Sequence, residues 1–351
     1  ALASCLFARS GDFAQNGAHT LATLIGWGIT FVGMLGLTLC FYKLAILKPK
    51  LKNGIYSYAR SGFGEYVGFN SAWGYWLSAI LCVVAYLYLV METLGHYFPA
   101  FGGEELFLPI LVSLAVIWFS AFLILRSVNQ AIYLNSFIVL VKCLPIVVVP
   151  LAIILCGSFD FGIFMQNFAG DVSMPLFDQV KGTLTLTVWI FIGIEGTVVI
   201  SGRAKKNKDT GRATMLTFGI LFSLYFLISF LSMGVMPAED LAALPNPSLG
   251  GVLSYVTGSQ WGGIFVDLSL IISVGGALFS WLILAVDSMY APAKGGSFPK
   301  ILAVKNKFNS PRWSVIVTAF ALSFLVIAAF VSNSSFQVCY PFSTINIIIP
   351  Y

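Results

Sequence analysis

The stretch Trp189-Ile-Phe-Ile-Gly193-Ile-Glu195-Gly196-Thr197 decides how this chain is interpreted, because it places one carboxylate inside an apolar segment broken by glycines. A charge at membrane depth costs about 2.5–3.5 kcal/mol even on insertion scales, so a carboxylate such as Glu195 is rarely found there without a function. The glycines on either side predict a helix that unwinds in mid-span, which lipid-facing backbone does not tolerate. Together these features indicate a substrate site in a transporter.

The composition of the whole chain supports a membrane protein. Of its 351 residues, 58% are hydrophobic and only 9% are charged, and the mean hydropathy is +0.91. Soluble domains carry about 25% charged residues, so we expect an all-α polytopic membrane protein in a lipid bilayer. Topology explains the net charge of +5 better than nucleic-acid binding does, so no nucleic-acid partner is expected.

Apolar stretches long enough to cross a bilayer of about 30 Å predict about ten helices, the first and last incomplete. The complete spans are expected at 20–42, 70–95, 107–126, 132–156, 183–201, 214–236, 262–288 and 313–332. A fragment at 1–16 and an unfinished span at 336–351 add the other two. We therefore expect a single transmembrane domain over 1–351 that is cut at both ends and carries no cleavable signal peptide.

Lysine and arginine are concentrated in alternate loops. Sixteen of the nineteen basic residues fall in one set of loops, at Lys43, Lys48, Lys50, Lys52, Arg60, Arg126, Arg203, Lys205, Lys206, Lys208, Arg212, Lys294, Lys300, Lys305, Lys307 and Arg312. Cytoplasmic loops carry an excess of these residues, so this set is predicted to be cytoplasmic and residues 1–19 to lie on the opposite side.

Two further features are expected at the membrane surface. The segment 52–60 is predicted to form a short cytoplasmic interfacial helix. Tyrosines and tryptophans near span ends are typical of an interfacial belt, and this assignment covers Trp73, Tyr75, Trp76, Tyr97, Trp261, Tyr290 and Trp313.

The sequence carries no recognisable catalytic motif. Its two histidines, His19 and His96, lie near the outer face, without an HExxH motif, a nucleophile elbow or a phosphate loop. The six cysteines lie mostly in apolar runs and show no CxxC spacing, which is typical of packing residues. We therefore expect no metal, no cofactor and no enzymatic activity.

Glu195 is the leading candidate for substrate recognition and for gating or proton coupling. Gly193 and Gly196 suit a broken helix that lines a cavity, where half-helix ends offer free N–H and C=O groups to the charged ends of an amino acid. The carboxylate is then able to attract a cationic side chain or to exchange a proton. The alternative is a structural carboxylate that is protonated or bonded to neighbouring backbone.

Five other residues are candidates of the same kind. Lys142 lies about ten residues from either span end, too deep to snorkel easily, and is a candidate internal cation or proton carrier; a lysine in a polar pocket without function is the alternative. The indoles of Trp189 and Trp281 suit a cation–π contact, although packing alone also explains them. Tyr86 and Thr197 complete the set of candidates.

At these residues the sequence resembles the amino acid–polyamine–organocation superfamily, and within it the basic amino acid antiporters that exchange arginine for ornithine or agmatine. The resemblance runs from about residue 20 to the end. It rests on separated motifs in register, at Gly26-Trp27, Lys48–Arg60, Gly68–Trp76, Trp189–Glu195, Ser201–Lys205, Leu241–Ser248, Ile271–Gly275 and Gly296–Lys300.

The resemblance implies a LeuT-like fold in the bacterial cytoplasmic membrane. Ten helices would form two inverted five-helix repeats, with the first and sixth helices broken, and a homodimer is compatible with it. Trp189 would be an aromatic gate, Glu195 the carboxylate of a proximal gate, and Trp281 a platform for the guanidinium of arginine. Lys142 would occupy the place where sodium-coupled relatives bind a cation.

Two stretches depart from the superfamily pattern. Ser4-Cys-Leu-Phe-Ala-Arg-Ser10 lacks the Gly-Ser-Gly-like break that holds the substrate's α-carboxylate. Cys82-Val83 stands where relatives usually have Gly-Asn, and we expect loss of that amide to alter substrate choice.

The expected function is antiport by alternating access. A cationic amino acid, arginine first, would exchange for its decarboxylated or deiminated product, agmatine or ornithine. A proton-coupled uptake permease of the same fold is the alternative, with Lys142 or Glu195 carrying the proton. A channel is disfavoured because no repeated polar stripe or charge ring is present.

Overall fold

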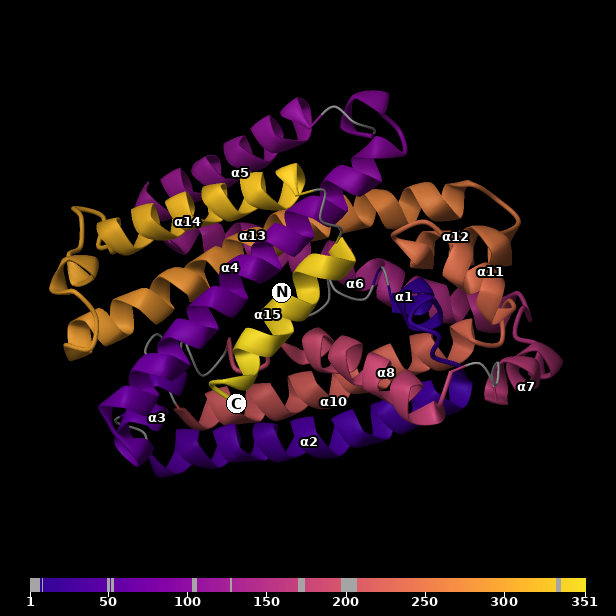
Figure 1. The fold of residues 1–351 in the computed structure, drawn as a ribbon, viewed down its shortest axis with the longest axis horizontal. Coiled ribbons are helices and arrows are strands. Elements are labelled where there is room, and N and C mark those ends of the chain that lie inside the picture. The colour runs from indigo at the N-terminus through magenta and orange to yellow at the C-terminus, as the bar shows by residue number, and fades with distance from the viewer. Residues whose placement is uncertain are drawn as a thin grey trace.

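Long apolar helices build the protein, as its hydropathy predicts. The computed structural model describes residues 7, 9–48, 51, 54–102, 106–126, 128–169, 174–196, 207–332 and 336–351. Within these ranges the side chains of 9–10, 128–137, 139–140, 142, 169, 207–210 and 336–338 are outside the description. Figure 1 shows helices throughout.

The helices follow one another along the chain with short connections. They are α1 (Arg9–Gln15), α2 (Thr20–Leu47), α3 (Gly54–Phe63), α4 (Glu65–Gly95), η2 (Pro99–Phe101), α5 (Phe107–Arg126), α6 (Val128–Leu155), α7 (Phe161–Ala169), α8 (Leu176–Phe191), α10 (Asn207–Ser232), α11 (Ala238–Ala243), α12 (Ser248–Thr257), α13 (Trp261–Gly295), η4 (Lys300–Ala303), α14 (Arg312–Val331) and α15 (Phe336–Ile348).

Six helices in the described part are long and apolar enough to cross a membrane. They are α2, α4, α5, α10, α13 and α14, and each corresponds to a predicted span, although α10 ends at Ser232, before the predicted end at 236. Some continue past the predicted ends: α4 begins at Glu65 and α13 reaches Gly295. Hydropathy reports only the hydrocarbon core, whereas backbone hydrogen bonds carry a helix on into the polar interface. The predicted 132–156 span corresponds to α6.

The helix that corresponds to the span predicted at 183–201 begins earlier than predicted. The helix α8 starts at Leu176, after Pro175, and ends at Phe191. Its first turns carry Asp178, Gln179 and Lys181, so hydropathy alone misses them although they are helical.

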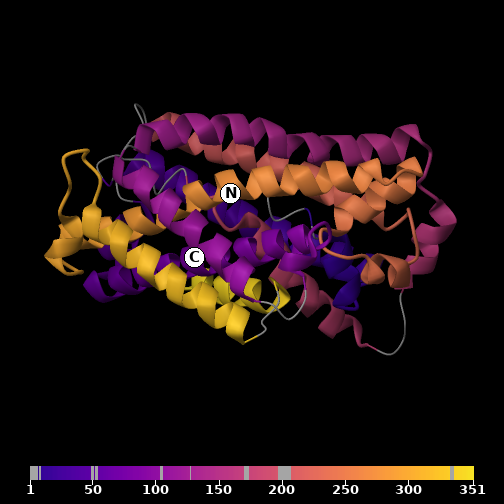
Figure 2. The ribbon, with the colours of Figure 1, turned by 90° about the horizontal axis from the view of Figure 1, so that it is seen from above.

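The helices form two packed groups, one above the other in Figure 1, and Figure 2 gives the view from above. In one group α2 packs against both α8 and α10, and in the other α4 packs against α13 and α15, while α14 packs against α5. Aromatic side chains fill the first group: the Trp27 ring centroid lies 6.3 Å from that of Phe191 and 5.5 Å from that of Phe222. The buried side chains of both groups belong to one continuous hydrophobic core.

The described parts of the basic loops lie at one end of the molecule, on the left in Figure 1. Asn306 Nδ2 donates to the carbonyl of Leu125 at 2.8 Å, which joins the end of α5 to the loop before α14. A Cβ on Gly211 would lie 2.7 Å from Tyr42 Cδ2, so the start of α10 lies against α2. The excess of Lys and Arg assigns this end to the cytoplasm.

The predicted interfacial helix is present as α3, and Arg60 joins it to the end of α13. The guanidinium Nη1 donates to the carbonyl of Gly295 at 2.8 Å and to Tyr56 Oη at 3.0 Å. Its Nη2 lies 3.4 Å from Glu65 Oε1, which also accepts a hydrogen bond from Ser297 Oγ at 2.7 Å. The helix α3 and the end of α13 therefore meet here, although their contacting residues are more than 230 positions apart along the chain.

The predicted aromatic belt is wrong at two positions. Tyr75 is 2% exposed and Trp76 is 6% exposed, and Trp76 Nε1 donates to Thr318 Oγ1 at 3.1 Å. Both point into the protein because α4 is covered by α13, α14 and α15. Trp73, Tyr97, Trp261 and Trp313 are exposed, as belt residues should be.

Candidate functional site

The predicted break lies at the end of α8. Gly193 has φ +104°, a conformation that favours glycine. The chain turns through Ile192–Glu195 and becomes helical again at Gly196. The N–H of Ile192 donates to the carbonyl of Trp189 at 3.1 Å, and that of Gly196 to Gly193 at 3.0 Å. Glu195 therefore projects from irregular backbone that is buried in protein, where such backbone is tolerated.

Glu195 is fully buried, and its two carboxylate oxygens differ. Oε2 accepts the N–H of Gly193 at 3.1 Å and the hydroxyl of Tyr351. Oε1 has no hydrogen-bond partner among the described residues. The bond from the Gly193 N–H fits the alternative interpretation of Glu195 as a structural carboxylate bonded to neighbouring backbone, but only for Oε2. Oε1 remains available as an acceptor.

Tyr75 of α4 faces the same carboxylate. Its hydroxyl lies close enough to Glu195 to interact electrostatically, yet within the described structure that hydroxyl has no partner of hydrogen-bond geometry. Tyr75 and Tyr351 thus approach Glu195 from α4 and from the residues after α15. Both helices belong to the second packed group, and α15 also contacts α8 directly.

Trp189 lies beside this cluster, one helical turn before the break. Its ring centroid is 5.7 Å from that of Tyr86 and 5.3 Å from that of Tyr340. All three side chains are buried. The structure therefore brings together Trp189 and Tyr86, two of the residues selected from sequence.

Trp281 is fully buried on α13, and in the described part of the chain its Nε1 has no hydrogen-bond partner. Leu284, on the same helix, packs at the break, because its Cδ1 would lie 3.5 Å from a Cβ on Gly196. Trp281 thus belongs to the helix that covers Gly196.

Two predicted site residues cannot be placed. Thr197 lies outside the described residues, and so does the side chain of Lys142, whose backbone belongs to α6.

Sequence reasoning missed Tyr75 and Tyr351. A signal for Tyr75 exists, because residues 75, 79, 82 and 86 fall on one face of α4 at helical spacing. Cys82 on that face interacts electrostatically with Tyr75. Tyr351 follows Pro350, after the end of α15, and no local pattern links it to Glu195.

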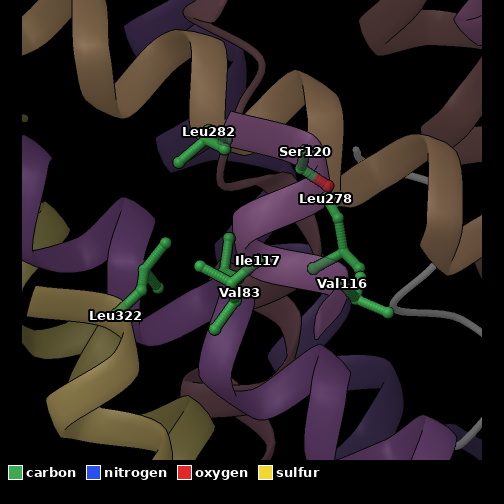
Figure 3. Close-up of a pocket in the computed structure, with 7 residues that line it drawn as sticks. All are labelled: Val83, Val116, Ile117, Ser120, Leu278, Leu282 and Leu322. Carbon is green, nitrogen blue, oxygen red and sulfur yellow. The ribbon is translucent and has the colours of Figure 1, made fainter. Parts of the chain in front are cut away.

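Val83 stands at the position where loss of an amide was expected to alter substrate choice. It lines a small cavity between α4, α5, α13 and α14, which Figure 3 shows. Apart from the Ser120 hydroxyl the lining is apolar, with Val116, Ile117, Leu278, Leu282 and Leu322. An amide at position 83 would meet that apolar wall, so valine suits the cavity.

In the ranges that the structure describes, no three His, Cys, Asp or Glu side chains are grouped to hold a metal ion.

The sequence matches a known protein family over its whole length. A sequence model of the family described as amino acid permease matches residues 1–351. The arginine/ornithine antiporter of Pseudomonas aeruginosa is 40% identical over 317 residues, which are 89% of this chain and 65% of that protein. The arginine/agmatine antiporter of Chlamydia trachomatis is 36% identical over 321 residues, 90% of this chain and 66% of that protein.

A solved structure shows the same fold. It is the substrate-bound, outward-open state of a Na+-coupled sialic acid symporter, with a TM-score of 0.62 and 18% sequence identity. The match covers 95% of this chain and 72% of that one. The predicted LeuT-like architecture of two inverted five-helix repeats is thus confirmed.

This chain spans about two thirds of the length of the two antiporters. The family match over every residue, the identity and the shared fold lead to one assignment: the chain belongs to the amino acid permease family, whose members are membrane transporters.

Proposed function

We propose that this protein is a membrane antiporter that exchanges a cationic amino acid, arginine first, for ornithine or agmatine by alternating access. The observation that carries the proposal is Glu195 at the helix break, a fully buried carboxylate with one oxygen unpartnered among the described residues. A buried unpaired charge is costly, so a cationic ligand that reaches Oε1 would be strongly favoured. The exchange partners named for the two antiporter relatives agree with such a ligand.

The surroundings of Glu195 suit an organic cation. The rings of Trp189 and Tyr86 pack together one helical turn before the break, and a guanidinium or ammonium over an aromatic face gains roughly 0.5–2 kcal/mol. The C-terminal end of α8 carries the negative end of the helix dipole, which also attracts positive charge. In this proposal Trp281 supplies the stacking platform for the guanidinium, and Gly193, Gly196 and Thr197 form the backbone of the site.

We further propose that Tyr75, Glu195 and Tyr351 form a gate. Glu195 follows α8 in one packed group, whereas Tyr75 and Tyr351 come from α4 and α15 in the other. Alternating access requires the two groups to move relative to each other, so this contact must break and re-form in each cycle. The substrate cation would compete with the tyrosines for the carboxylate, which couples binding to gate opening.

Residues 1–351 would act as one transport unit without catalytic chemistry, and Lys142 would act as an internal cation. A homodimer is the proposed assembly, which cross-linking in membranes would test.

Proteoliposomes test antiport directly. Labelled arginine should enter only when the vesicles contain arginine, ornithine or agmatine, and an imposed proton gradient alone should drive no uptake. Uptake into empty vesicles driven by a proton gradient would establish the alternative, a proton-coupled permease. Counterflow against a panel of unlabelled amines would then rank the substrates.

A further inference from the structure

The cytoplasmic end carries a surface that the transport cycle does not use. It consists of η4, the loop before α14 and the end of α5, and it presents five exposed cations, Arg126, Lys300, Lys305, Lys307 and Arg312. We call this the basic rim. Asn306, in the centre of the loop, bonds to the carbonyl of Leu125 at 2.8 Å and so brings Arg126 to the same surface. The loop projects from the left end of the molecule in Figure 1.

The positive charge of the basic rim is uncompensated. The sequence has no Asp or Glu between Ser288 and Tyr351. Within the described residues no carboxylate forms an ion pair with any of the five cations, and the nearby Glu65 already binds Arg60 and Ser297. Four of the five cations lie instead over aromatic rings, such as Arg126 at 5.0 Å from the Phe122 centroid and Arg312 at 5.5 Å from that of Trp313.

Apolar side chains are interleaved with these cations. Ile301 is 52% exposed, Val304 51%, Phe308 46% and Trp313 38%. A surface that alternates basic and apolar side chains at the end of membrane spans matches a bilayer interface, where cations meet phosphates and apolar groups enter the acyl boundary. A soluble phosphate would engage only the cations, so the exposed apolar residues favour a lipid.

The loop is held in shape before any ligand binds. Asn306 Oδ1 accepts the N–H groups of Phe308 at 2.9 Å and Ser310 at 3.1 Å, and Arg312 N–H donates to the carbonyl of Val304 at 3.1 Å. Ser314 Oγ donates to the carbonyl of Leu302 at 2.7 Å. Ligand binding therefore carries little cost of ordering the backbone.

We propose that the basic rim is a binding site for the phosphate headgroups of anionic phospholipids in the cytoplasmic leaflet. Lys305, Lys307 and Arg312 contact the phosphates, while Phe308 and Trp313 enter the acyl boundary. Anionic lipids of this leaflet attract basic segments next to a membrane span, and the attraction grows with each Lys or Arg. This site is independent of the substrate site at Glu195.

Native mass spectrometry of the purified protein tests the proposal, with equal amounts of phosphatidylglycerol and phosphatidylcholine supplied in detergent micelles. We expect the wild type to retain phosphatidylglycerol preferentially. The triple variant Lys305→Gln, Lys307→Gln, Arg312→Gln should lose this preference by on the order of a hundredfold, since three surface cations are removed. Retention of phosphatidylcholine should stay unchanged.

A matched variant removes the same number of exposed cations elsewhere, with Lys43→Gln, Lys48→Gln and Lys181→Gln. Its lipid preference should equal that of the wild type. The charge-preserving pair Lys305→Arg, Lys307→Arg should also keep the preference, which keeps the test valid if the triple variant folds poorly. An equal loss in the matched variant, or unchanged lipid preference in the triple variant, would overturn the proposal. Displacement of the lipid by equimolar glycerol phosphate would assign the site to free phosphates instead.

Discussion

The hydroxyl of Tyr351 donates a hydrogen bond to Glu195, although the two residues are 156 positions apart. Glu195 follows α8, which packs with α2, whereas Tyr351 follows α15, which packs on α4. The bond therefore joins the two packed groups of helices at the point where α8 ends. It leaves Glu195 Oε1 without a hydrogen-bond partner in the described structure.

Replacing the carboxylate tests the centre of the proposed site. Glu195→Gln keeps the shape of the side chain and removes its charge, so it should slow arginine exchange by about tenfold or more, because hydrogen bonds to charged groups contribute about 1.5–3 kcal/mol. Counterflow in proteoliposomes measures this, and the variant should still insert in the membrane. Glu65→Gln, at an exposed carboxylate, is the control. Exchange at the wild-type rate in Glu195→Gln would contradict the role of this residue.

Removing the Tyr351 hydroxyl tests the gate. Tyr351→Phe keeps the ring but deprives Glu195 Oε2 of a donor, which should lower the free energy of unfolding by about 1–3 kcal/mol. Thermal unfolding in detergent, followed by fluorescence, measures the change. Tyr66→Phe, at a tyrosine that is 79% exposed, should leave the transition in place. If both variants melt like the wild type, the bond contributes nothing to the closed gate.

The indole of Trp281 has its own test. Trp281→Leu keeps an apolar side chain and removes the π-face, so the apparent affinity for arginine should fall about two- to thirtyfold, from a loss of roughly 0.5–2 kcal/mol. Competition by unlabelled arginine during exchange gives this affinity. Trp261→Leu, on the same helix at a site 75% exposed, is the matched control. An unchanged affinity in Trp281→Leu would leave Trp281 as a packing residue.

Gly68 tests the packing of α3 on α4. A Cβ at Gly68 would lie 2.7 Å from Arg60 Cβ, so Gly68→Ala should displace Arg60 and destabilise the protein by about 1–3 kcal/mol, as overpacking does. Gly62, in α3, has open space around an added Cβ, so Gly62→Ala should be neutral or slightly stabilising. Melting temperatures in detergent separate the two variants. Equal melting temperatures would show that Arg60 adjusts without cost.

Much of the fold was predictable because it depends on local properties of the chain. A run of apolar residues must become a helix in a bilayer, since its backbone groups have no other hydrogen-bond partners. The same reasoning located the break, because only glycine adopts the φ of +104° at Gly193 without strain. It failed at the start of α8, where the polar residues Asp178, Gln179 and Lys181 conceal the first helical turns.

The candidate site was only partly predictable. Glu195, Trp189 and Tyr86 stood out because a buried charge and mid-span aromatic residues are visible in the sequence. Tyr75 lies near other aromatic residues of a span end and was assigned to the membrane interface, yet it is 2% exposed and faces Glu195. Its position depends on which helices cover α4, and hydropathy carries no information on that choice.

The sequence by itself determined an all-α membrane protein, the end that faces the cytoplasm and the carboxylate at a broken helix. These follow from hydropathy, charge placement and glycine, each of which acts within one helix or loop. Only the tertiary structure decided that Tyr75 and Tyr351 close on Glu195, and that Arg60 binds the end of α13. Those contacts join residues far apart along the chain, and the packing of whole helices against one another sets their distances.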